Sequence, residues 1–203
     1  MRSLGDVLYN FHWVVPGKVA RSSQAYAGLL SPFLKRHGIR SVLNLRGPNP
    51  KFRWWHYEKR VTDKLDIEHV DLPLNSRNLV LQLQLSKLLR AFDAMTAPVL
   101  VKCSGGQDRT SFACALYIIH RDGWGAYGTA MKQFSRWPYL HFPKPHQRWL
   151  REFPTYAREQ SAGVPLLQWV EQSYLPEHFR LWLKTGGKEN FFRGLYKRPP
   201  RGL

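Results

Sequence analysis

The sequence predicts an α/β fold with a largely parallel central sheet flanked by helices, followed by a helical C-terminal extension. Short apolar runs with strand character, at 39–45, 67–72 and 99–101, alternate with segments whose apolar residues recur at helical spacing. Such alternation is typical of parallel strands joined by helical crossovers. A length of 203 residues suits one domain with a modest extension. We therefore expect a main domain at 1–160 and an extension at 161–203.

The N-terminal part predicts a hairpin and a helix. Residues 12–21 read as two short strands around Pro16 and Gly17, a pair that favours a turn. In residues 24–37 the apolar positions recur at i, i+3, i+4, i+7 and i+8, and Gly38 follows as a C-terminal cap. This pattern predicts an amphipathic helix.

The middle of the chain supplies the sheet. Between the strands expected at 39–45 and 67–72 lies a Trp-rich segment that we interpret as a helix with one buried aromatic face. A further helix is expected at 81–92, and a third strand at 99–101 follows it. A strongly apolar segment at 110–120 then predicts a buried helix.

The C-terminal part predicts short helices separated by prolines. A helix is expected at 125–136, and six prolines follow beyond Trp137 and before residue 180. We interpret this region as helical. It ends in a basic tail that contains Lys184, Lys188, Arg193, Lys197, Arg198 and Arg201.

The charge of the chain favours anionic partners. It carries 31 Lys and Arg against 14 Asp and Glu, a formal net charge of +17. Such a charge attracts phosphorylated substrates, anionic membrane surfaces and nucleic acids. Trp54, Trp55 and Tyr57, which lie among basic residues, could stack on nucleobases or insert at a membrane interface, although a buried aromatic face is the favoured interpretation.

Cysteine content and hydropathy indicate the compartment. Two cysteines are too few for a disulfide framework in a chain of this length, which favours a reducing environment. No apolar run approaches the roughly 18 residues of a membrane-spanning helix. We expect a cytoplasmic protein.

The loop after the third strand has the composition of an anion site. Here a strand, two glycines and the start of a helix follow one another, so backbone N–H groups converge near a helix N-terminus. The same donors and Arg109 would stabilise the thiolate of Cys103. Arg109, six positions after Cys103, could hold two phosphate oxygens with its planar fork. The other candidate phosphate-binding residues are Ser104, Gly105, Gly106, Gln107 and Thr110.

This loop resembles a known signature. The pattern Cys103-x-x-Gly106-x-x-Arg109-Thr110 after an apolar strand is similar to the C-x5-R motif of the protein tyrosine and dual-specificity phosphatases. Residues 19–24 and 38–46 also resemble segments that precede the motif in the atypical dual-specificity phosphatases of plants, fungi and bacteria. Lys102, where a His usually precedes the nucleophile, and Ser111, where a Gly often follows, depart from the common pattern.

The resemblance implies a reaction. Cys103 would attack phosphorus and form a phosphocysteine, an acid would protonate the leaving alkoxide, and water would hydrolyse the intermediate. No metal or other cofactor is implied, and the histidines show no metal-binding spacing. We expect a phosphomonoester hydrolase of the tyrosine or dual-specificity type.

Two carboxylates are candidates for the acid. Asp71 ends the second strand, close to the family's spacing before Cys103, yet the loop at 73–78 that should present an acid holds no carboxylate. Asp108 lies in the signature loop, and its Gly-x-Asp-Arg-Thr context resembles the myotubularins and some bacterial phosphatases, where that Asp is the proposed acid. We favour Asp108 and keep Asp71 as the alternative.

Several alternatives stay open at this point. The substrate could be a phosphorylated protein, or a phosphoinositide or inositol phosphate. A catalytically silent module that binds phosphate or nucleic acid is the alternative from another class, although the intact Cys103 and Arg109 argue against it and nucleic acid is not an expected partner. Peripheral contact with an anionic membrane fits the charge. Cys114 is expected in the core, with a resolving thiol as the alternative, and Arg21 and Arg46 could line the phosphate pocket or be solvated.

Overall fold

The strand that leads into the cysteine loop lies at the centre of the sheet. In the computed structural model, β6 (Val99–Lys102) is the middle strand of five, in the order β1-β2-β6-β3-β4. It pairs in parallel with β2 (Val19–Ser22) and β3 (Ser41–Asn44), and β4 (Glu68–Asp71) pairs in parallel with β3. The edge strand β1 (His12–Val15) is antiparallel to β2. The predicted hairpin and largely parallel sheet are confirmed.

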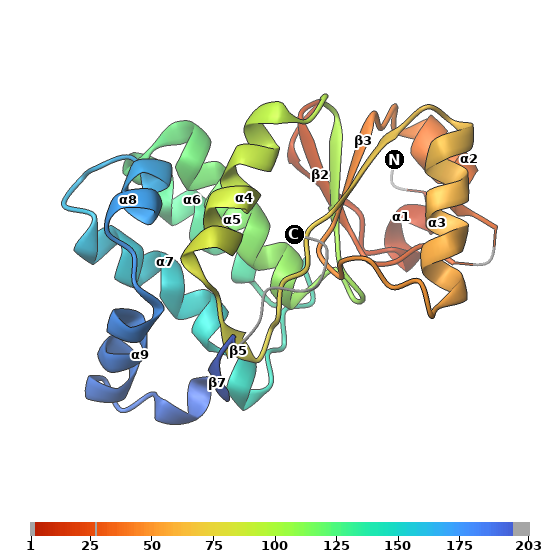
Figure 1. The fold of residues 1–203 in the computed structure, drawn as a ribbon. Helices are drawn as coiled ribbons and strands as arrows, with labels where there is room; N and C mark the ends of the chain where they lie inside the picture. Colours follow the sequence, from red (N-terminus) through yellow and green to blue (C-terminus); the bar gives the residue numbers. More distant parts are fainter. Residues whose placement is uncertain (1–2, 27, 197–203) are drawn as a thin grey trace.

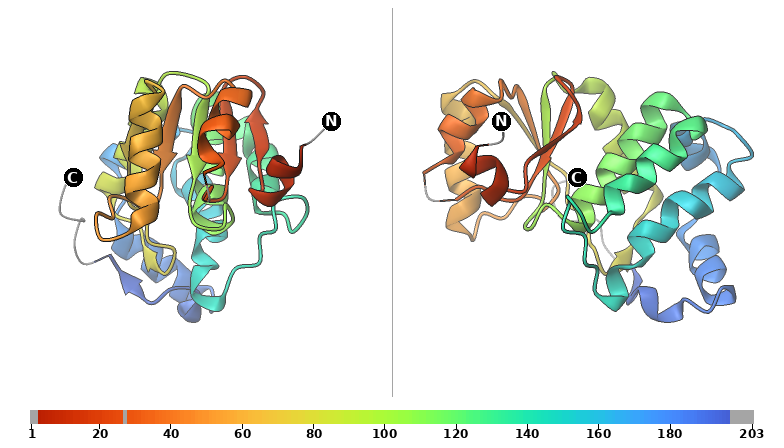
Figure 2. Two further views of the ribbon diagram at one scale, coloured as in Figure 1. Left: turned by 90° about the vertical axis from the view of Figure 1, so that its right-hand side faces the viewer. Right: turned by 180° about the vertical axis from the view of Figure 1, so that it is seen from behind.

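The structure describes residues 3–26 and 28–196. Helices α1 (Leu4–Leu8), α2 (Leu30–Arg36) and α3 (Arg53–Lys64) cover one face of the sheet, and the other helices cover the opposite face (Figures 1 and 2). These others are α4 (Gln82–Ala94), α5 (Asp108–Asp122), η1 (Trp124–Ala126), α6 (Tyr127–Met131), η2 (Lys132–Phe134), η3 (Pro145–Gln147), α7 (Trp149–Gln160), α8 (Leu166–Gln172), α9 (Pro176–Thr185) and η4 (Glu189–Phe191).

Alternating side chains of β6 divide the core in two. Leu100 packs with the cluster under α2 and α3, whereas Val99 and Val101 pack with the larger cluster under α4 and α5. This alternation is the period of two of a strand that is buried on both faces. The central position of β6 fixes the loop that follows it from both sides.

Helix α5 is the centre of the larger cluster. All its residues from Thr110 to Ile119 are buried, which explains why its apolar residues show no amphipathic period. Phe112 makes edge contacts with Trp149 and Phe153 of α7, each with ring centroids 5.5 Å apart. The N-terminus of α5, which carries the end of the cysteine loop, is therefore anchored in the core.

The predicted helices differ from the structure at two places. The segment 24–37 is helical only from Leu30, because the residues before it run over the cysteine loop, where the Gln24 N–H donates to the Ser104 carbonyl at 3.0 Å. The segment 125–136 is divided among η1, α6 and η2 rather than one helix. Local periodicity does not register such tertiary bonds.

The C-terminal region shares the larger core. Buried side chains of α8 and α9, including Trp169 and Phe179, belong to the same cluster as α5. Two short strands that the sequence did not predict, β5 (Asn78–Leu79) and β7 (Gly194–Leu195), pair in parallel. The division into a domain at 1–160 and an extension at 161–203 stays a prediction.

Half of the predicted basic tail lies among the described residues. Lys184 lies in the last turn of α9, and the Lys188 ammonium pairs with Glu152 at 2.6 Å. The Arg193 N–H donates to the Arg77 carbonyl at 2.8 Å. The other tail residues, Lys197, Arg198 and Arg201, lie outside the described residues.

Within the described ranges, no helix combines the length and the apolar character that crossing a membrane requires.

Candidate active site

A polar pocket of about 420 Å³ opens at the carboxyl end of β6. In parallel sheets this edge is where ligands bind, because loop and helix N–H groups face it. Its walls come from the cysteine loop, from the segment after β4 and from η3. The lining residues are Leu74, Asn75, Ser76, Arg77, Cys103, Ser104, Gly105, Gln107, Asp108, Arg109 and Gln147.

Cys103 lies at the base of this pocket with 3% of its surface exposed. Burial raises the pKa of its thiol, but the Arg109 charge, the Thr110 hydroxyl and the backbone N–H groups of Thr110 and Gln107 lower the pKa more. The net pKa of Cys103 lies below its ordinary value. A lowered pKa supplies thiolate near neutral pH, and the thiolate is the nucleophilic form.

Arg109 is held by carbonyl groups of two neighbouring segments. Its Nη1 donates to the carbonyl of Leu45, after β3, at 3.2 Å and to that of Leu74, after β4, at 3.4 Å. Both bonds use one nitrogen, and the described residues accept no bond from the other guanidinium nitrogens. The remaining donors of the planar fork are free to bind an oxyanion in the pocket.

Gly106 lies where only a glycine fits. Its φ is +63°, and a Cβ there would lie 2.6 Å from the carbonyl carbon of Ser22 and 2.6 Å from the nitrogen of Ser23. Both the backbone conformation and the contact with β2 therefore exclude a side chain. Gly106 does not line the pocket, so its role is to let the loop pack on β2.

Arg21 supports the cysteine loop from behind. Fully buried on β2, it donates from Nη2 to the Gly106 carbonyl at 2.8 Å and to the Ser111 hydroxyl at 2.9 Å. Its Nη1 donates to the side-chain oxygen of Gln133 at 2.8 Å. The Gly106 carbonyl is thus engaged by Arg21, and Gly106 is absent from the pocket lining. Arg21 is thus neither a pocket residue nor a solvated one, the two alternatives that the sequence left open.

Asp108 is the one carboxylate among the described residues that line the pocket. Burial raises its pKa above the ordinary value, although Arg109, its own N–H and Lys144 oppose the shift. Its Oδ1 is buried and has no hydrogen-bond partner among the described residues. A carboxyl group in this environment holds a proton at higher pH than an exposed Asp.

His141 is the nearest titratable neighbour of that oxygen. Its Nε2 lies 3.6 Å from Asp108 Oδ1, beyond hydrogen-bond distance, and is itself without a partner among the described residues. Burial lowers the pKa of His141 to about 4, with Arg21 and Arg151 adding to the effect and a hydrogen bond to Phe134 opposing it. The ring is neutral at pH 7, so the contact is not an ion pair and does not force Asp108 to ionise.

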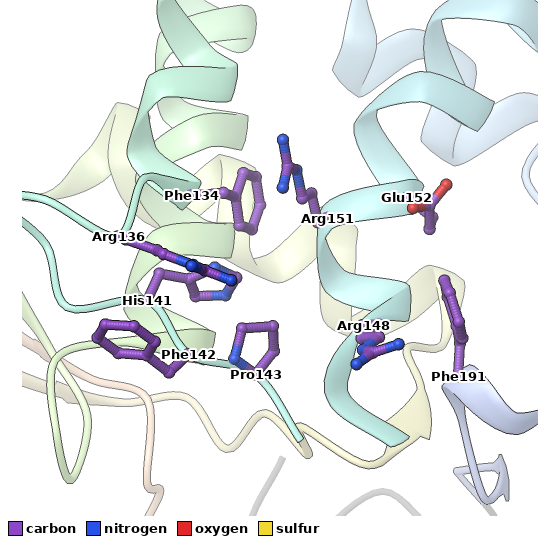
Figure 3. A pocket seen from close by; sticks show the side chains of 9 residues that line it. All are labelled: Phe134, Arg136, His141, Phe142, Pro143, Arg148, Arg151, Glu152 and Phe191. Atoms are coloured by element: carbon purple, nitrogen blue, oxygen red, sulfur yellow. The ribbon is translucent and has the colours of Figure 1, made fainter. Parts of the chain in front are cut away.

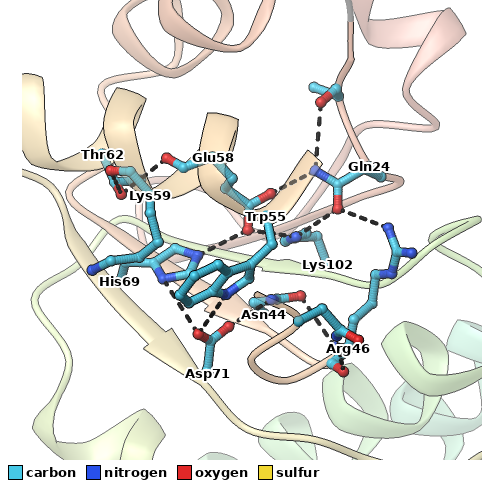
Figure 4. Close-up of polar contacts among 12 residues, drawn as sticks. Gln24, Asn44, Arg46, Trp55, Glu58, Lys59, Thr62, His69, Asp71 and Lys102 are labelled. Carbon is cyan, nitrogen blue, oxygen red and sulfur yellow. Dashed lines mark hydrogen bonds and ion pairs between the residues drawn. The ribbon is translucent and has the colours of Figure 1, made fainter. Parts of the chain in front are cut away.

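Asp71 lies outside the pocket, within a polar network on the α3 side of the sheet (Figure 4). Its two oxygens accept hydrogen bonds from Asn44 Nδ2 at 2.6 Å and from Trp55 Nε1 at 2.8 Å. These bonds tie the ends of β3 and β4 to α3. The structure thus brings Asp108, and not Asp71, together with Cys103 and Arg109.

Lys102 also points into this network. Its ammonium, 2% exposed, pairs with Glu58 Oε1 at 2.5 Å and donates to Gln24 at 2.7 Å (Figure 4). The same Glu58 oxygen lies 2.8 Å from His69 Nε2. The ammonium therefore lies on the face of β6 that is covered by α3, not on the face that packs against α5. It stands beside Cys103 in sequence but serves the α3 interface.

Three other residues that the sequence analysis named, Thr110, Cys114 and Arg46, do not line the pocket. Thr110 is buried at the start of α5 and acts on Cys103 rather than on the pocket surface. Cys114 is fully buried in α5, and burial raises its pKa to about 12, as expected of a core thiol. The Arg46 guanidinium stacks on Trp54, 3.4 Å from the ring centroid, and does not line the pocket. Gln147 and Arg77 line it without any local sequence signal.

A protein-family comparison decides the family. A family model described as "Swiss Army Knife protein, DSP-PTPase phosphatase domain" matches residues 8–161, well over half of the chain. The chain belongs to this family. It is a phosphatase hydrolase of the dual-specificity and tyrosine phosphatase type. A search of curated proteins found no match.

Solved structures share the fold of this phosphatase at low identity. TpbA of P. aeruginosa is 17% identical with a TM-score of 0.53, and the alignment covers 87% of this chain and 92% of TpbA. A TpbA structure in complex with pTyr is 16% identical with a TM-score of 0.51, covering 91% and 96% of the two chains. The catalytic core of the PP-IP phosphatase SIW14 from S. cerevisiae, in complex with citrate, is 17% identical with a TM-score of 0.53, covering 88% and 93%.

Proposed function

We propose that this phosphatase hydrolyses phosphomonoesters through a phosphocysteine formed on Cys103. The observation that carries the proposal is the thiol of Cys103 at the base of a polar pocket, its pKa lowered by Arg109 and by the loop amides. In such a pocket the groups that stabilise the thiolate also bind the phosphate oxygens. Ser104, Gly105 and Gln107 line the same pocket and are the proposed phosphate-binding residues.

The proposed reaction has two steps. In the first, Cys103 Sγ bonds to phosphorus, the ester P–O bond breaks, and protonated Asp108 gives its proton to the leaving oxygen. In the second, water attacks phosphorus, the Asp108 carboxylate accepts a proton from it, and the S–P bond breaks to release phosphate and thiolate. Arg109 holds two equatorial oxygens in both transition states.

Asp108 is the proposed acid because of its position and its pKa. It lines the pocket with Cys103, and burial favours its protonated form. The ring of His141 is neutral, so it carries no positive charge that would favour the ionised form of Asp108. Asp71 has both oxygens engaged by Asn44 and Trp55, which supports a structural role.

The substrate class has two candidates. A phosphorylated protein is one, and the similarity to a pTyr-bound structure is compatible with it. An inositol phosphate or phosphoinositide is the other, and one observation favours it: Arg77 lines the pocket beside Arg109, and the described residues accept no bond from its guanidinium. A second cation in the pocket suits a substrate with more than one phosphate.

We also propose a cytoplasmic location, because both cysteines are free thiols and Cys103 must stay reduced to act. The formal charge of +17 supports peripheral contact with anionic membranes.

The test combines one variant with a substrate panel. Cys103→Ser should abolish turnover and still bind vanadate, because Arg109 and the loop amides remain. Wild-type kcat/KM should then be compared on phosphotyrosine peptide, phosphoserine peptide, phosphoinositides and soluble inositol phosphates. Turnover near the wild-type level in Cys103→Ser would refute the proposal, and the panel ranks the two substrate classes.

A further inference from the structure

A second cavity, of about 390 Å³, lies beside the catalytic pocket and shares none of its lining residues. Its volume falls within the range of small-molecule sites, roughly 300–1,000 Å³. The two pockets meet at η3 and at His141. Gln147 lines the catalytic pocket and Arg148 lines the second, while the His141 ring lines the second and faces Asp108. We call it the arginine pocket, with the lining residues Phe134, Arg136, His141, Phe142, Pro143, Arg148, Arg151, Glu152 and Phe191 (Figure 3).

Three guanidinium groups line this cavity without a carboxylate to balance them. Arg136, Arg148 and Arg151 come from two segments, and none of the three makes a side-chain hydrogen bond or ion pair with the described residues. The one acid of the lining, Glu152, is engaged by the ammonium of Lys188 at 2.6 Å. The cavity is therefore strongly positive, and its cations keep their donors available.

Aromatic rings hold two of these cations in place. The Arg136 guanidinium lies 5.8 Å from the ring centroid of Phe142, and that of Arg148 lies 5.6 Å from the ring centroid of Phe191. Such stacking positions a guanidinium without using its N–H donors. Figure 3 shows Arg136 with Phe142, and Arg148 with Phe191, among the side chains that line the pocket. All three arginines are exposed at this surface, so their unused N–H donors can reach an oxyanion that enters the pocket.

His141 adds a neutral group to the wall. Buried at 3% exposure, it carries a lone unpartnered nitrogen among the described residues, and its low pKa reflects in part the charge of Arg151. A dianion comes closer than a monoanion to balancing three guanidinium charges, and phosphate presents oxygens that match their forks. A carboxylate carries a single charge and would leave two cations unbalanced.

We propose that the arginine pocket is a second phosphate-binding site, distinct from the cysteine loop. It would take a phosphate group held by Arg136, Arg148 and Arg151. That group can belong to the molecule whose other phosphate enters the catalytic pocket, or to a separate molecule. The binding site itself does not depend on the proposed chemistry at Cys103.

Binding of inorganic phosphate tests the site directly. Calorimetric titration of the full chain at low ionic strength should show two phosphate sites. The double variant Arg136→Gln/Arg151→Gln should retain one, with binding at the other weakened about 100-fold or more, because each lost charge-assisted bond weakens binding about tenfold or more. Arg109→Ala should retain the arginine-pocket site and lose the catalytic one.

A matched control distinguishes the loss of a specific phosphate site from the effect of a lower net charge. Arg60→Gln/Arg180→Gln removes the same two charges from exposed positions on α3 and α9 and should keep both phosphate sites. Arg148→Gln is the second variant, used should the double variant unfold. The proposal is overturned if the wild type has one phosphate site and Arg109→Ala removes it, or if the control weakens binding as much as the double variant does. The catalytic proposal fails, and this one stands, if the wild type has one phosphate site that Arg109→Ala leaves unchanged and Arg136→Gln/Arg151→Gln weakens.

Kinetics can show whether the phosphate group in the arginine pocket belongs to the substrate or to a separate molecule. If one molecule occupies both pockets, the ratio of kcat/KM for inositol hexakisphosphate to that for 4-nitrophenyl phosphate should fall about tenfold in the Arg136→Gln/Arg151→Gln variant. An unchanged ratio, with phosphate binding lost, assigns the pocket to a separate phosphate-bearing molecule. Each result supports the site and names its ligand.

Discussion

At the scale of single residues, the pocket combines a thiol that loses its proton easily with a carboxyl that keeps it. Cys103 is buried and Asp108 is half-buried. Arg109 and the loop amides outweigh the effect of burial on the pKa of Cys103, while burial dominates for Asp108. Shifts in these two directions increase the share of molecules in which the thiol is ionised while the carboxyl is protonated.

The role of Asp108 predicts a dependence on the leaving group. Asp108→Asn should depress kcat for alkyl phosphates far more than for activated aryl phosphates, because only a poor leaving group needs the proton. Since the acid form is the active one, alkyl phosphate turnover in the wild type should fall as pH rises through the raised pKa of Asp108. The variant should lose that fall.

Asp71→Asn is the matched control. It removes a carboxylate that accepts bonds from Asn44 and Trp55, so stability should drop while the ratio between alkyl and aryl substrates stays constant. A selective loss of alkyl phosphate turnover in Asp71→Asn alone would assign the acid to that residue instead.

Gly106 predicts a steric limit. Gly106→Ala should destabilise the fold by about 1–3 kcal/mol through the strained backbone, and a loop displaced by about 1 Å should lower kcat/KM about 100-fold. Urea denaturation and steady-state kinetics measure both. Gly128→Ala in α6, where a Cβ meets nothing within 4 Å, is the control and should neither destabilise the fold nor lower kcat/KM. Normal activity in Gly106→Ala would show that the loop can move away from β2.

At the scale of elements, the sequence predicted the strands and helices that have a periodic apolar pattern. It did not predict the contacts between segments that are distant along the chain. The strands, α4 and α5 follow from apolar periodicity, and Cys103, Arg109 and Gly106 follow from one contiguous loop. Arg21 reaches the loop from β2, and the sequence named it as a pocket candidate without predicting the bonds it makes behind the loop. His141 reaches the loop from the segment after η2, and no local pattern marks it. Gln24 was placed in a helix, although its side chain and N–H are used by Lys102 and Ser104. Hydrogen bonds between distant segments leave no periodic pattern in the sequence, so periodicity cannot predict them.

The network between β6 and α3 predicts a large stability effect. Lys102→Met should lower the free energy of unfolding by about 3–5 kcal/mol, because it leaves the buried Glu58 carboxylate without its cation. Lys59→Met, which breaks an exposed pair with Asp63 on α3, should cost less than about 1 kcal/mol. Urea denaturation compares the two. Equal costs would mean that the buried pair contributes no more than a surface one.

At the scale of the whole molecule, the C-terminal residues return to the catalytic pocket. Strand β7 pairs with β5, and the N–H groups of Arg193 and Tyr196 donate to the carbonyls of Arg77 and Leu79 at 2.8 and 3.2 Å. Arg77 lines the pocket. Strand β7 therefore supports the segment that carries Arg77, and Figure 1 shows β7 beside β5.

This arrangement predicts the result of truncation. A chain that ends at residue 190 loses both backbone bonds, worth about 0.5–1.5 kcal/mol each, and KM for 4-nitrophenyl phosphate should rise because Arg77 is less well held. A chain that ends at residue 196 keeps β7 and is the control. Thermal unfolding and kinetics compare the two. An unchanged KM in the shorter chain would show that β7 does not position the pocket.

The central claim is a covalent phosphate on Cys103, and rapid acid quench followed by mass spectrometry of the peptides tests it most directly. During turnover of 4-nitrophenyl phosphate, one phosphate should be found on the peptide that contains Cys103. The Cys114 peptide should stay unmodified, because that thiol is fully buried and its pKa is raised to about 12. Turnover at the full rate with no phosphate on Cys103 at any quench time, or with Cys103→Ser, would contradict the mechanism.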